Sequence, residues 1–171
     1  MKLFIPSELI QRVKRELRSA GRREIGGVLV GEHIEGEIFR LVELSVQRNG
    51  GNVAHFNRDD VQGRAFVANY LSRTGKDPRM CNYLGEWHSH PLFTPTPSGE
   101  DVTTMFDIVR DPRVGMSFAV LIIARLQRWS TLQMSATVFQ ANGTAIAIDV
   151  EVEGLPRQDG WLAWVTRFFQ A

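Results

Sequence analysis

Closely spaced prolines constrain the fold of this chain more than any other feature of its sequence. Pro91 ends an apolar run at 80–90 that is typical of a strand, and the stretch LFTPTPS at 92–98 contains two further prolines. Proline lacks a backbone donor and breaks helices and central strands, so 92–98 is predicted to be a loop. Ser98 followed by GEDVTTMFDIVRD is a helix-starting pattern. The segment therefore predicts a strand, a stiff loop and a helix in succession.

The rest of the chain shows helical and strand patterns in turn. Apolar spacing predicts helices at 7–20, with Ser7 as N-cap and Gly21 as its end, and at 59–74 after a polar loop. Strands are expected at 25–32, 37–46, 116–124, 130–139 and 144–152. This order predicts an α/β (α+β) fold in which helices flank a mixed sheet. An aromatic run at 161–169 is predicted to form a short terminal helix.

Composition limits the class of protein. The 171 residues, 43% of them hydrophobic, suit one globular domain with a core. A net charge of +1, with basic and acidic residues interspersed, argues against a nucleic-acid partner. No stretch approaches the roughly 18 to 20 apolar residues of a membrane span, so no membrane association is expected. The single cysteine, Cys81, excludes an internal disulfide and favours a reducing, cytoplasmic setting.

Two histidines and a carboxylate indicate a metal site. His88 and His90 are two residues apart on the predicted strand, so their side chains point to the same side. Asp101 lies at the start of the next helix, and the proline-stiffened loop can return it to the end of that strand. Three protein ligands with one open position are typical of catalytic zinc, which lowers the pKa of bound water. We therefore expect one Zn²⁺ per chain, bound by His88, His90 and Asp101.

A general base has two candidates in the sequence. Glu24 precedes the first buried strand, and Glu86 lies two residues before His88. The residue pattern alone leaves both open, although Glu86 is so close in sequence that it would lie beside the metal ligands rather than across the substrate from them. Ser98 is at an N-cap position, which explains its residue type without any catalytic role.

Other chemically active side chains have simpler interpretations. Cys81 lies beside a strand and has no matching histidine, so it is expected to be a small core residue. His33 and His55 are in turn or loop settings and are expected to be solvated.

The passage His88-Ser89-His90-Pro91, followed by six residues and Ser98-Gly99-Glu100-Asp101, resembles the JAMM motif of JAB1/MPN/Mov34 metallopeptidases in every spacing. The stretch EIGGVLVG at 24–31 is also similar to the first strand of that family, whose preceding glutamate is the general base. The resemblance covers about residues 1–138. It implies that Glu24 is the base, that His88, His90 and Asp101 bind zinc, and that Ser98 helps to stabilise the oxyanion.

The same resemblance implies a fold and a reaction. It predicts a cytidine-deaminase-like JAB/MPN domain over 1–153, with the aromatic segment 154–171 docked on it as a helix. The chain is similar to compact prokaryotic JAB proteins, so the implied activity is cleavage after the C-terminal tail of a ubiquitin-like protein. The implied partners are that protein, its conjugated target and E1- and E2-like enzymes, in some cases within an antiviral pathway.

Three alternatives to this interpretation differ from it in substrate or in function. The same metal site serves relatives that hydrolyse sulfur-carrier adducts or small amides, and the sequence does not separate these substrates. A noncatalytic MPN scaffold could bind partners through the terminal aromatic helix, but such scaffolds usually lack part of the ligand set. A zinc deaminase requires paired cysteines, which this chain does not have.

Overall fold

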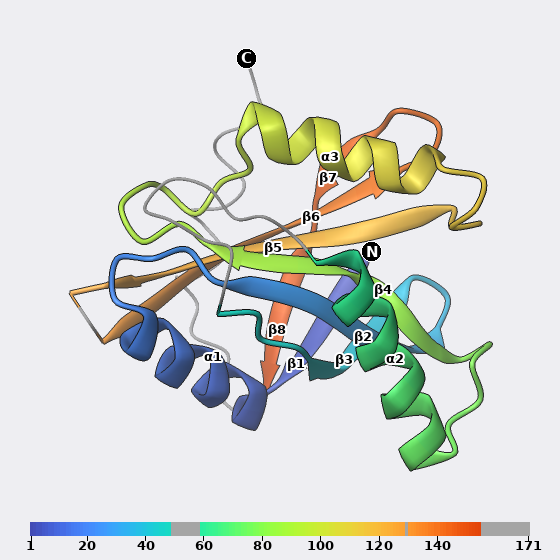
Figure 1. Cartoon of the computed structure of the whole chain (residues 1–171), viewed down its shortest axis with the longest axis horizontal. Coiled ribbons are helices and arrows are strands. Elements are labelled where there is room, and N and C mark those ends of the chain that lie inside the picture. Colours follow the sequence, from blue (N-terminus) through green and yellow to red (C-terminus); the bar gives the residue numbers. More distant parts are fainter. Residues whose placement is uncertain (49–58, 129, 155–171) are drawn as a thin grey trace.

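The structure, a computed structural model, describes residues 1–48, 59–128 and 130–154. Within these ranges, three helices flank one curved sheet of eight strands (Figure 1). The helices are α1 (Ser7–Ala20), α2 (Asp60–Thr74) and α3 (Gly99–Arg110). The strands are β1 (Lys2–Pro6), β2 (Gly26–Glu35), β3 (Ile38–Leu44), β4 (Cys81–Ser89), β5 (Phe118–Gln127), β6 (Thr131–Gln140), β7 (Ala145–Ala147) and β8 (Asp149–Glu153). The predicted α/β class with a mixed sheet is confirmed, whereas the predicted terminal helix and His55 lie outside the described residues.

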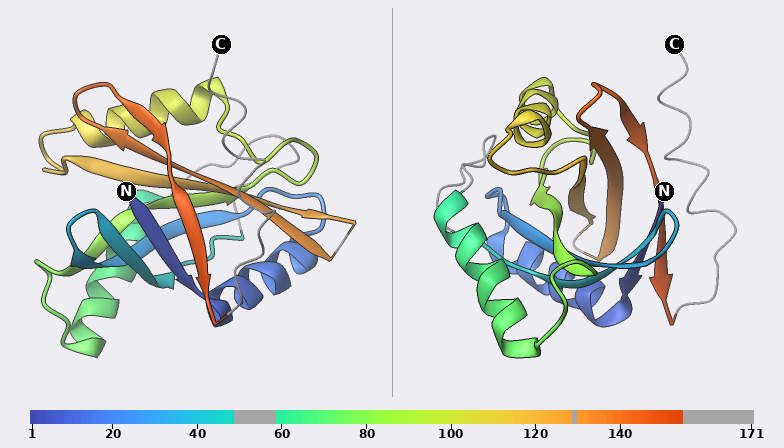
Figure 2. Two further views of the ribbon diagram at one scale, coloured as in Figure 1. Left: turned by 180° about the vertical axis from the view of Figure 1, so that it is seen from behind. Right: turned by 90° about the vertical axis from the view of Figure 1, so that its right-hand side faces the viewer.

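The strand order is β7-β6-β5-β4-β2-β3-β1-β8. β1 pairs in parallel with β3 and β8, β4 pairs in parallel with β5, and the other pairs are antiparallel. β7 pairs with β6 at one margin while β8, one residue further along the chain, pairs with β1 at the other. The chain at 145–153 therefore bridges both margins and gives the sheet its barrel-like curvature (Figure 2).

That bridging corrects the prediction of a single strand at 144–152. Ile148 separates β7 from β8, its side chain is buried, and its N–H donates to the carbonyl of Ala136. The run TAIAIDVEV contains no glycine or proline that would mark a break, so its pattern does not show that its two halves have different partners. The run divides into two strands because β7 pairs with β6 at one margin of the sheet and β8 pairs with β1 at the other.

The sequence pattern did not predict the first strand, β1. β1 is five residues long, buries Leu3 and Ile5, and pairs with partners more than thirty residues away. The prediction of Ser7 as N-cap was also wrong, because Pro6 takes that position without a side-chain cap bond and Ser7 is the first helical residue. Gly21 ends α1 as predicted.

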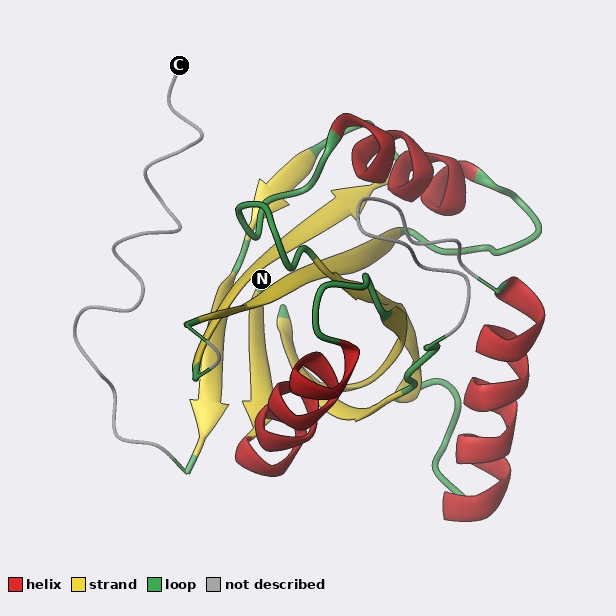
Figure 3. Ribbon diagram, turned by 60° about the vertical axis from the view of Figure 1, so that its left-hand side comes forward, coloured by secondary structure: helices red, strands yellow, loops and turns green. Residues whose placement is uncertain are grey.

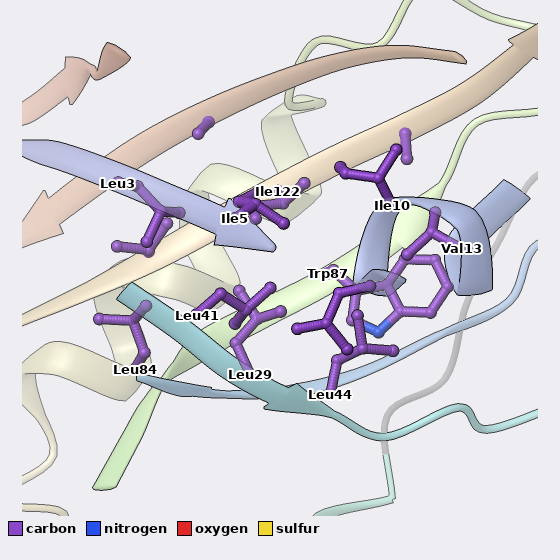
Figure 4. Packing of buried hydrophobic residues seen from close by; sticks show 14 of the residues in the cluster. Leu3, Ile5, Ile10, Val13, Leu29, Leu41, Leu44, Leu84, Trp87 and Ile122 are labelled. Carbon is purple, nitrogen blue, oxygen red and sulfur yellow. The ribbon is translucent and has the colours of Figure 1, made fainter. Parts of the chain in front are cut away.

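The two faces of the sheet are covered by different helices (Figure 3). On β5, Val120 and Ile122 join the cluster that includes α1, whereas Leu121 and Ile123 pack with α3. Figure 4 shows side chains of β1 and α1 meeting those of β2, β3 and β4 in the first cluster, with Trp87 among them. α2 covers the other part of the face that α3 occupies, over β2 and β4.

A bulge in β4 decides which of its residues reach that face. Leu29 pairs with Gly85 but Val30 pairs with Tyr83, so Leu84 has no partner of its own on β2. Gly85 has a φ of 151°, and a Cβ there would lie 1.9 Å from the carbonyl oxygen of Val120. The extra residue shifts the alternation, so Leu84 and Trp87, three positions apart, both point into the first core cluster, whereas Glu86 and His88 face the opposite side of the sheet.

Two further expectations are tested by the described part of the chain. Cys81 is buried in the cluster beneath α2, and burial raises the pKa of its thiol, which confirms its interpretation as a core residue. His33 lies on β2 rather than in a turn, with its Nε2 2.8 Å from the carbonyl oxygen of Gly36 in the adjoining hairpin turn. Within the described ranges, no helix has the length and apolar character needed to cross a bilayer.

Candidate metal centre

The three predicted ligands converge at the end of β4. The Nε2 atoms of His88 and His90 are 3.2 Å apart. Asp101, at the start of α3, places Oδ1 3.1 Å from Nε2 of His88 and Oδ2 3.6 Å from Nε2 of His90. One ligand atom from each residue lies within 4.8 Å of the others. Both histidines are buried and the carboxylate is nearly so.

These spacings fit a tetrahedral metal ion. Ligand atoms about 2.0 to 2.1 Å from zinc in a tetrahedral site are roughly 3.3 Å from one another. The two Nε2 atoms, 3.2 Å apart, and Oδ1 of Asp101, 3.1 Å from Nε2 of His88, are close to this spacing, and the second carboxylate oxygen, Oδ2, lies 3.6 Å from Nε2 of His90. Nδ1 of His90 is 3.1 Å from the carbonyl oxygen of Thr94, an arrangement in which Nδ1 donates and leaves Nε2 unprotonated for a metal. Three such atoms leave a fourth position for water or substrate, so the residues fit a catalytic ion.

The charges of the site also suit a cation. Burial lowers the pKa of His90, against the opposing effect of its bond to the Thr94 carbonyl, so its ring is neutral near pH 7. Burial alone would raise the pKa of Asp101, but its hydrogen bond and charge interaction with His88 and its bonds with Ser98 lower that pKa to about 2. A neutral imidazole and an ionised carboxylate are the forms that bind zinc.

Local structure at the start of α3 positions Asp101. Ser98 is the N-cap, and its Oγ accepts a hydrogen bond from the Asp101 N–H at 3.2 Å. In return, Oδ2 of Asp101 accepts from the Ser98 N–H at 2.6 Å, which completes a capping box. The helix start therefore holds the carboxylate with its other oxygen facing His88.

Glu24 is brought to the histidines by pairing between β2 and β4. Gly26 pairs with His88, so the chain just before β2 runs beside the end of β4. Between the two histidines, Ser89 Oγ accepts from the Ile25 N–H at 3.0 Å, and the Ser89 N–H donates to the Ile25 carbonyl at 2.8 Å. Glu24, the residue before Ile25, is only 4% exposed. Glu24 thus lies on the chain segment that is hydrogen-bonded directly to Ser89, between the two histidines at the end of β4.

One cavity of about 420 Å³ contains all five predicted site residues. It is lined by Glu24, Glu86, His88, His90, Phe93, Thr94, Thr96, Pro97, Ser98, Glu100, Asp101, Thr104, Met105 and Leu121. Four of these residues carry carboxylates and none is Lys or Arg, so a metal cation would offset part of a strongly negative charge. The arrangement places a buried carboxylate, a hydroxyl and a candidate metal-ligand set around one cavity, and these are the groups that metal-assisted hydrolysis requires.

Both candidate bases lie in this cavity, on different sides of the histidines. Glu86 is two residues before His88 on the same face of β4, and its Oε1 accepts from the Tyr83 hydroxyl at 3.2 Å. Glu24 approaches from β2 at the other end of the pair, near His90. The structure therefore brings the two candidate carboxylates into one cavity from different chain segments.

Three residues that support the site were not recognised in the sequence. Ser89 ties the two strands, Thr94 holds the ring of His90, and Arg125 donates from Nη1 to the Phe93 carbonyl at 2.8 Å. The alternation of strand residues could have indicated an inward-facing, buried Ser89 between two outward histidines. No local signal marks Arg125, because its partner is 32 residues away.

Comparisons with known proteins agree with this geometry. The family model described as prokaryotic homologues of the JAB domain matches residues 6–137. A protein of Enterobacter hormaechei subsp. hoffmannii (strain UCI 50), named CD-NTase/cGAS isopeptidase, is 29% identical over 139 residues, which are 80% of this chain and 74% of that protein. The solution structure of a protein from Desulfitobacterium hafniense superposes with a TM-score of 0.63 at 19% identity, covering 88% of this chain and 92% of that one.

The likeness to the solution structure shows the fold alone. The match to the family model shows more than the fold, because it extends from the end of β1 into β6 and includes every residue of the candidate metal centre. On this evidence the chain belongs to the prokaryotic JAB-domain family.

Proposed function

We propose that this protein is a zinc-dependent isopeptidase that removes a ubiquitin-like protein from its conjugates or trims its precursor. The observation that carries the proposal is the convergence of His88, His90 and Asp101 in one cavity with the buried carboxylate of Glu24. Family membership and the relative named CD-NTase/cGAS isopeptidase support the same class of reaction.

Each group of the cavity has a role in hydrolysis of an amide. Zinc bound by His88, His90 and Asp101 would supply a Lewis acid for the scissile carbonyl and for the attacking water. Glu24 accepts a proton from that water and returns it to the leaving lysine amine.

Ser98 combines a structural and a catalytic role in this scheme. Its Oγ accepts a hydrogen bond from the Asp101 N–H as the N-cap of α3, which leaves its own O–H proton available as a donor. The hydroxyl lines the cavity and donates to the oxyanion that develops on the scissile carbonyl.

The proposed partners follow from the resemblance and from the relative. They are a ubiquitin-like protein, its conjugated target and E1- and E2-like enzymes, with a CD-NTase-type enzyme as the target that the relative's name suggests. We propose that the pathway is a bacterial antiviral one in the cytoplasm, and that the catalytic domain spans 1–153. Hydrolysis of sulfur-carrier adducts or small amides by the same centre is the second candidate function.

The metal requirement is the direct test of the proposal. The protein purified without chelator is expected to contain about one zinc per chain and to cleave an isopeptide-linked conjugate of a ubiquitin-like protein. Chelation is expected to abolish cleavage, and stoichiometric zinc to restore it. Mass spectrometry of the metal and gel analysis of the conjugate measure both.

Two outcomes would redirect this assignment. Cleavage of a C-terminal amino-acid adduct but not of the isopeptide conjugate would favour the small-amide function. Protein without metal that nevertheless binds a partner tightly would indicate a noncatalytic scaffold.

Substitutions of Ser98 separate capping from catalysis. Ser98→Asn keeps a side-chain acceptor at the N-cap, whereas Ser98→Ala removes it and is expected to lower the free energy of unfolding by about 1 kcal/mol. If the hydroxyl binds the oxyanion, Ser98→Ala loses kcat by about 10²-fold or more, whereas Ser98→Asn, whose side-chain amide is also a donor, loses less. Urea unfolding and steady-state kinetics give the two quantities. A Ser98→Ala enzyme that is less stable but has normal kcat would leave Ser98 with the capping role alone.

A further inference from the structure

The loop between the two parts of the metal site is held in one conformation. Besides its prolines, it is held by the bond between Nδ1 of His90 and the Thr94 carbonyl at 3.1 Å. The hydroxyl groups of Thr94 and Thr96 are 3.0 Å apart, and the Thr96 N–H donates to the Thr94 carbonyl at 2.8 Å. The loop therefore does not need to be ordered when a substrate arrives.

Arg125 fastens the same loop to the sheet. Its Nη1 donates to the Phe93 carbonyl at 2.8 Å, and its Nε donates to Oε1 of Gln133 at 2.6 Å on β6. The preceding residue on β5, Ala124, accepts the N–H of His90 at 2.9 Å. The backbone at Phe93 is thus tied both to β5 and, through Thr94, to a metal ligand.

This loop presents two large apolar side chains that differ in one respect. Phe93 is 53% exposed and Leu92 is 43% exposed. Phe93 lines the cavity of the metal site, whereas Leu92 does not. Among the described residues that line the cavity, Phe93 is the only exposed large apolar side chain, since Met105 and Leu121 are buried.

The cavity walls are chemically unequal. Glu24, Glu86 and Glu100 contribute carboxylates, while Phe93, Pro97, Met105 and Leu121 contribute apolar surface. A peptide tail that ends in small residues can pass the metal ligands without filling this apolar surface. Its first larger side chain, one or more residues of about 3.3 Å each from the scissile bond, would meet the rim instead.

Building on the proposed function, we infer that Phe93 determines specificity for the residues that precede the scissile bond. Its ring packs against the nearest aliphatic side chain of the tail, and Arg125 positions it by holding its backbone carbonyl. An acidic or small side chain at that position gains no such contact, and an acidic one also faces the carboxylates of the cavity.

The test uses three synthetic probes, each an acyl tail ending in Gly-Gly and joined by an isopeptide bond to a lysine peptide. They differ only in the residue before Gly-Gly, which is Leu, Ala or Asp. The zinc-loaded natural protein is expected to hydrolyse the Leu probe with the highest kcat/KM. Phe93→Ala should lower kcat/KM for the Leu probe by about tenfold and reduce the Leu-to-Asp preference by at least fivefold.

Two control variants test whether the effect is specific to the apolar side chain at position 93. Leu92→Ala removes a similarly exposed apolar side chain outside the cavity and is expected to keep the full preference. Phe93→Leu retains an apolar wall and is expected to recover most of it. Zinc content near one per chain in every variant would show that the metal ligands are still in place.

Three results would overturn the inference. In the first, Phe93→Ala lowers kcat/KM equally for all three probes, which is the mark of a general structural effect. In the second, Leu92→Ala and Phe93→Ala behave alike. Failure of the natural protein to cleave any probe would be distinct from both, because it contradicts the proposed function itself and the inference with it.

Discussion

Replacing Glu24 by glutamine is expected to lower kcat by about 10²- to 10⁴-fold while the zinc content stays near one per chain. Glutamine keeps the size of the side chain but cannot accept a proton from the attacking water. Glu24 is not among the three residues whose ligand atoms converge, so metal binding should survive the change. Steady-state cleavage of an isopeptide conjugate and metal analysis of the same preparation measure the two properties.

Glu86→Gln is the matched control for this experiment. Glu86 lines the same cavity but lies on the other side of His88, where its carboxylate accepts from the Tyr83 hydroxyl. We expect Glu86→Gln to retain most of kcat. If instead Glu24→Gln were fully active and Glu86→Gln were not, the general base would be Glu86, and the assignment of Glu24 would be wrong.

Gly85→Ala is expected to lower the free energy of unfolding by about 3 kcal/mol or more, a large part of the roughly 5 to 15 kcal/mol that is typical of a domain. The backbone at Gly85 has a φ of 151°, a value that residues other than glycine rarely adopt. In addition, the new Cβ would lie 1.9 Å from the carbonyl oxygen of Val120, so β4 and β5 would have to move apart. Urea unfolding followed by circular dichroism measures the loss.

The variant Gly75→Ala distinguishes the effect of a positive φ from the effect of the steric contact with β5. Gly75 also has a positive φ, 65°, at the end of α2, but a Cβ there would meet no atom within 4 Å. It should therefore cost only about 1 kcal/mol, the ordinary penalty for a left-handed residue. Equal stability losses in the two variants would contradict the role given to the close approach of β5.

Elements whose signals are local could be predicted from the sequence. Ser98 and Asp101 form a capping box within one turn, and α3 starts at Gly99 as the pattern indicated. The histidines at 88 and 90 needed only strand alternation to be placed on one side. Their convergence with Asp101 was foreseeable as well, because the prolines leave the loop few conformations.

Other features depend on contacts between distant segments. β1 forms because β3 and β8 offer it two parallel partners, and the run at 145–153 divides because its halves pair with β6 and β1. The alternation of apolar residues records which side of a strand is buried but not which strand lies next to it. The carbonyl of Phe93 and the guanidinium of Arg125 are likewise brought together only by the fold.

The amino-acid sequence by itself therefore determined the candidate ligand set and its helix cap, since spacing along a strand and around a helix start is a local property of the backbone. Tertiary structure alone decided the positions of the two candidate bases. Glu24 reaches the histidines through the pairing of β2 with β4 and the bond between Ile25 and Ser89, while the bulge at Gly85 turns Glu86 toward the same cavity. Both depend on hydrogen bonds between strands that are far apart in the chain, which no local pattern encodes.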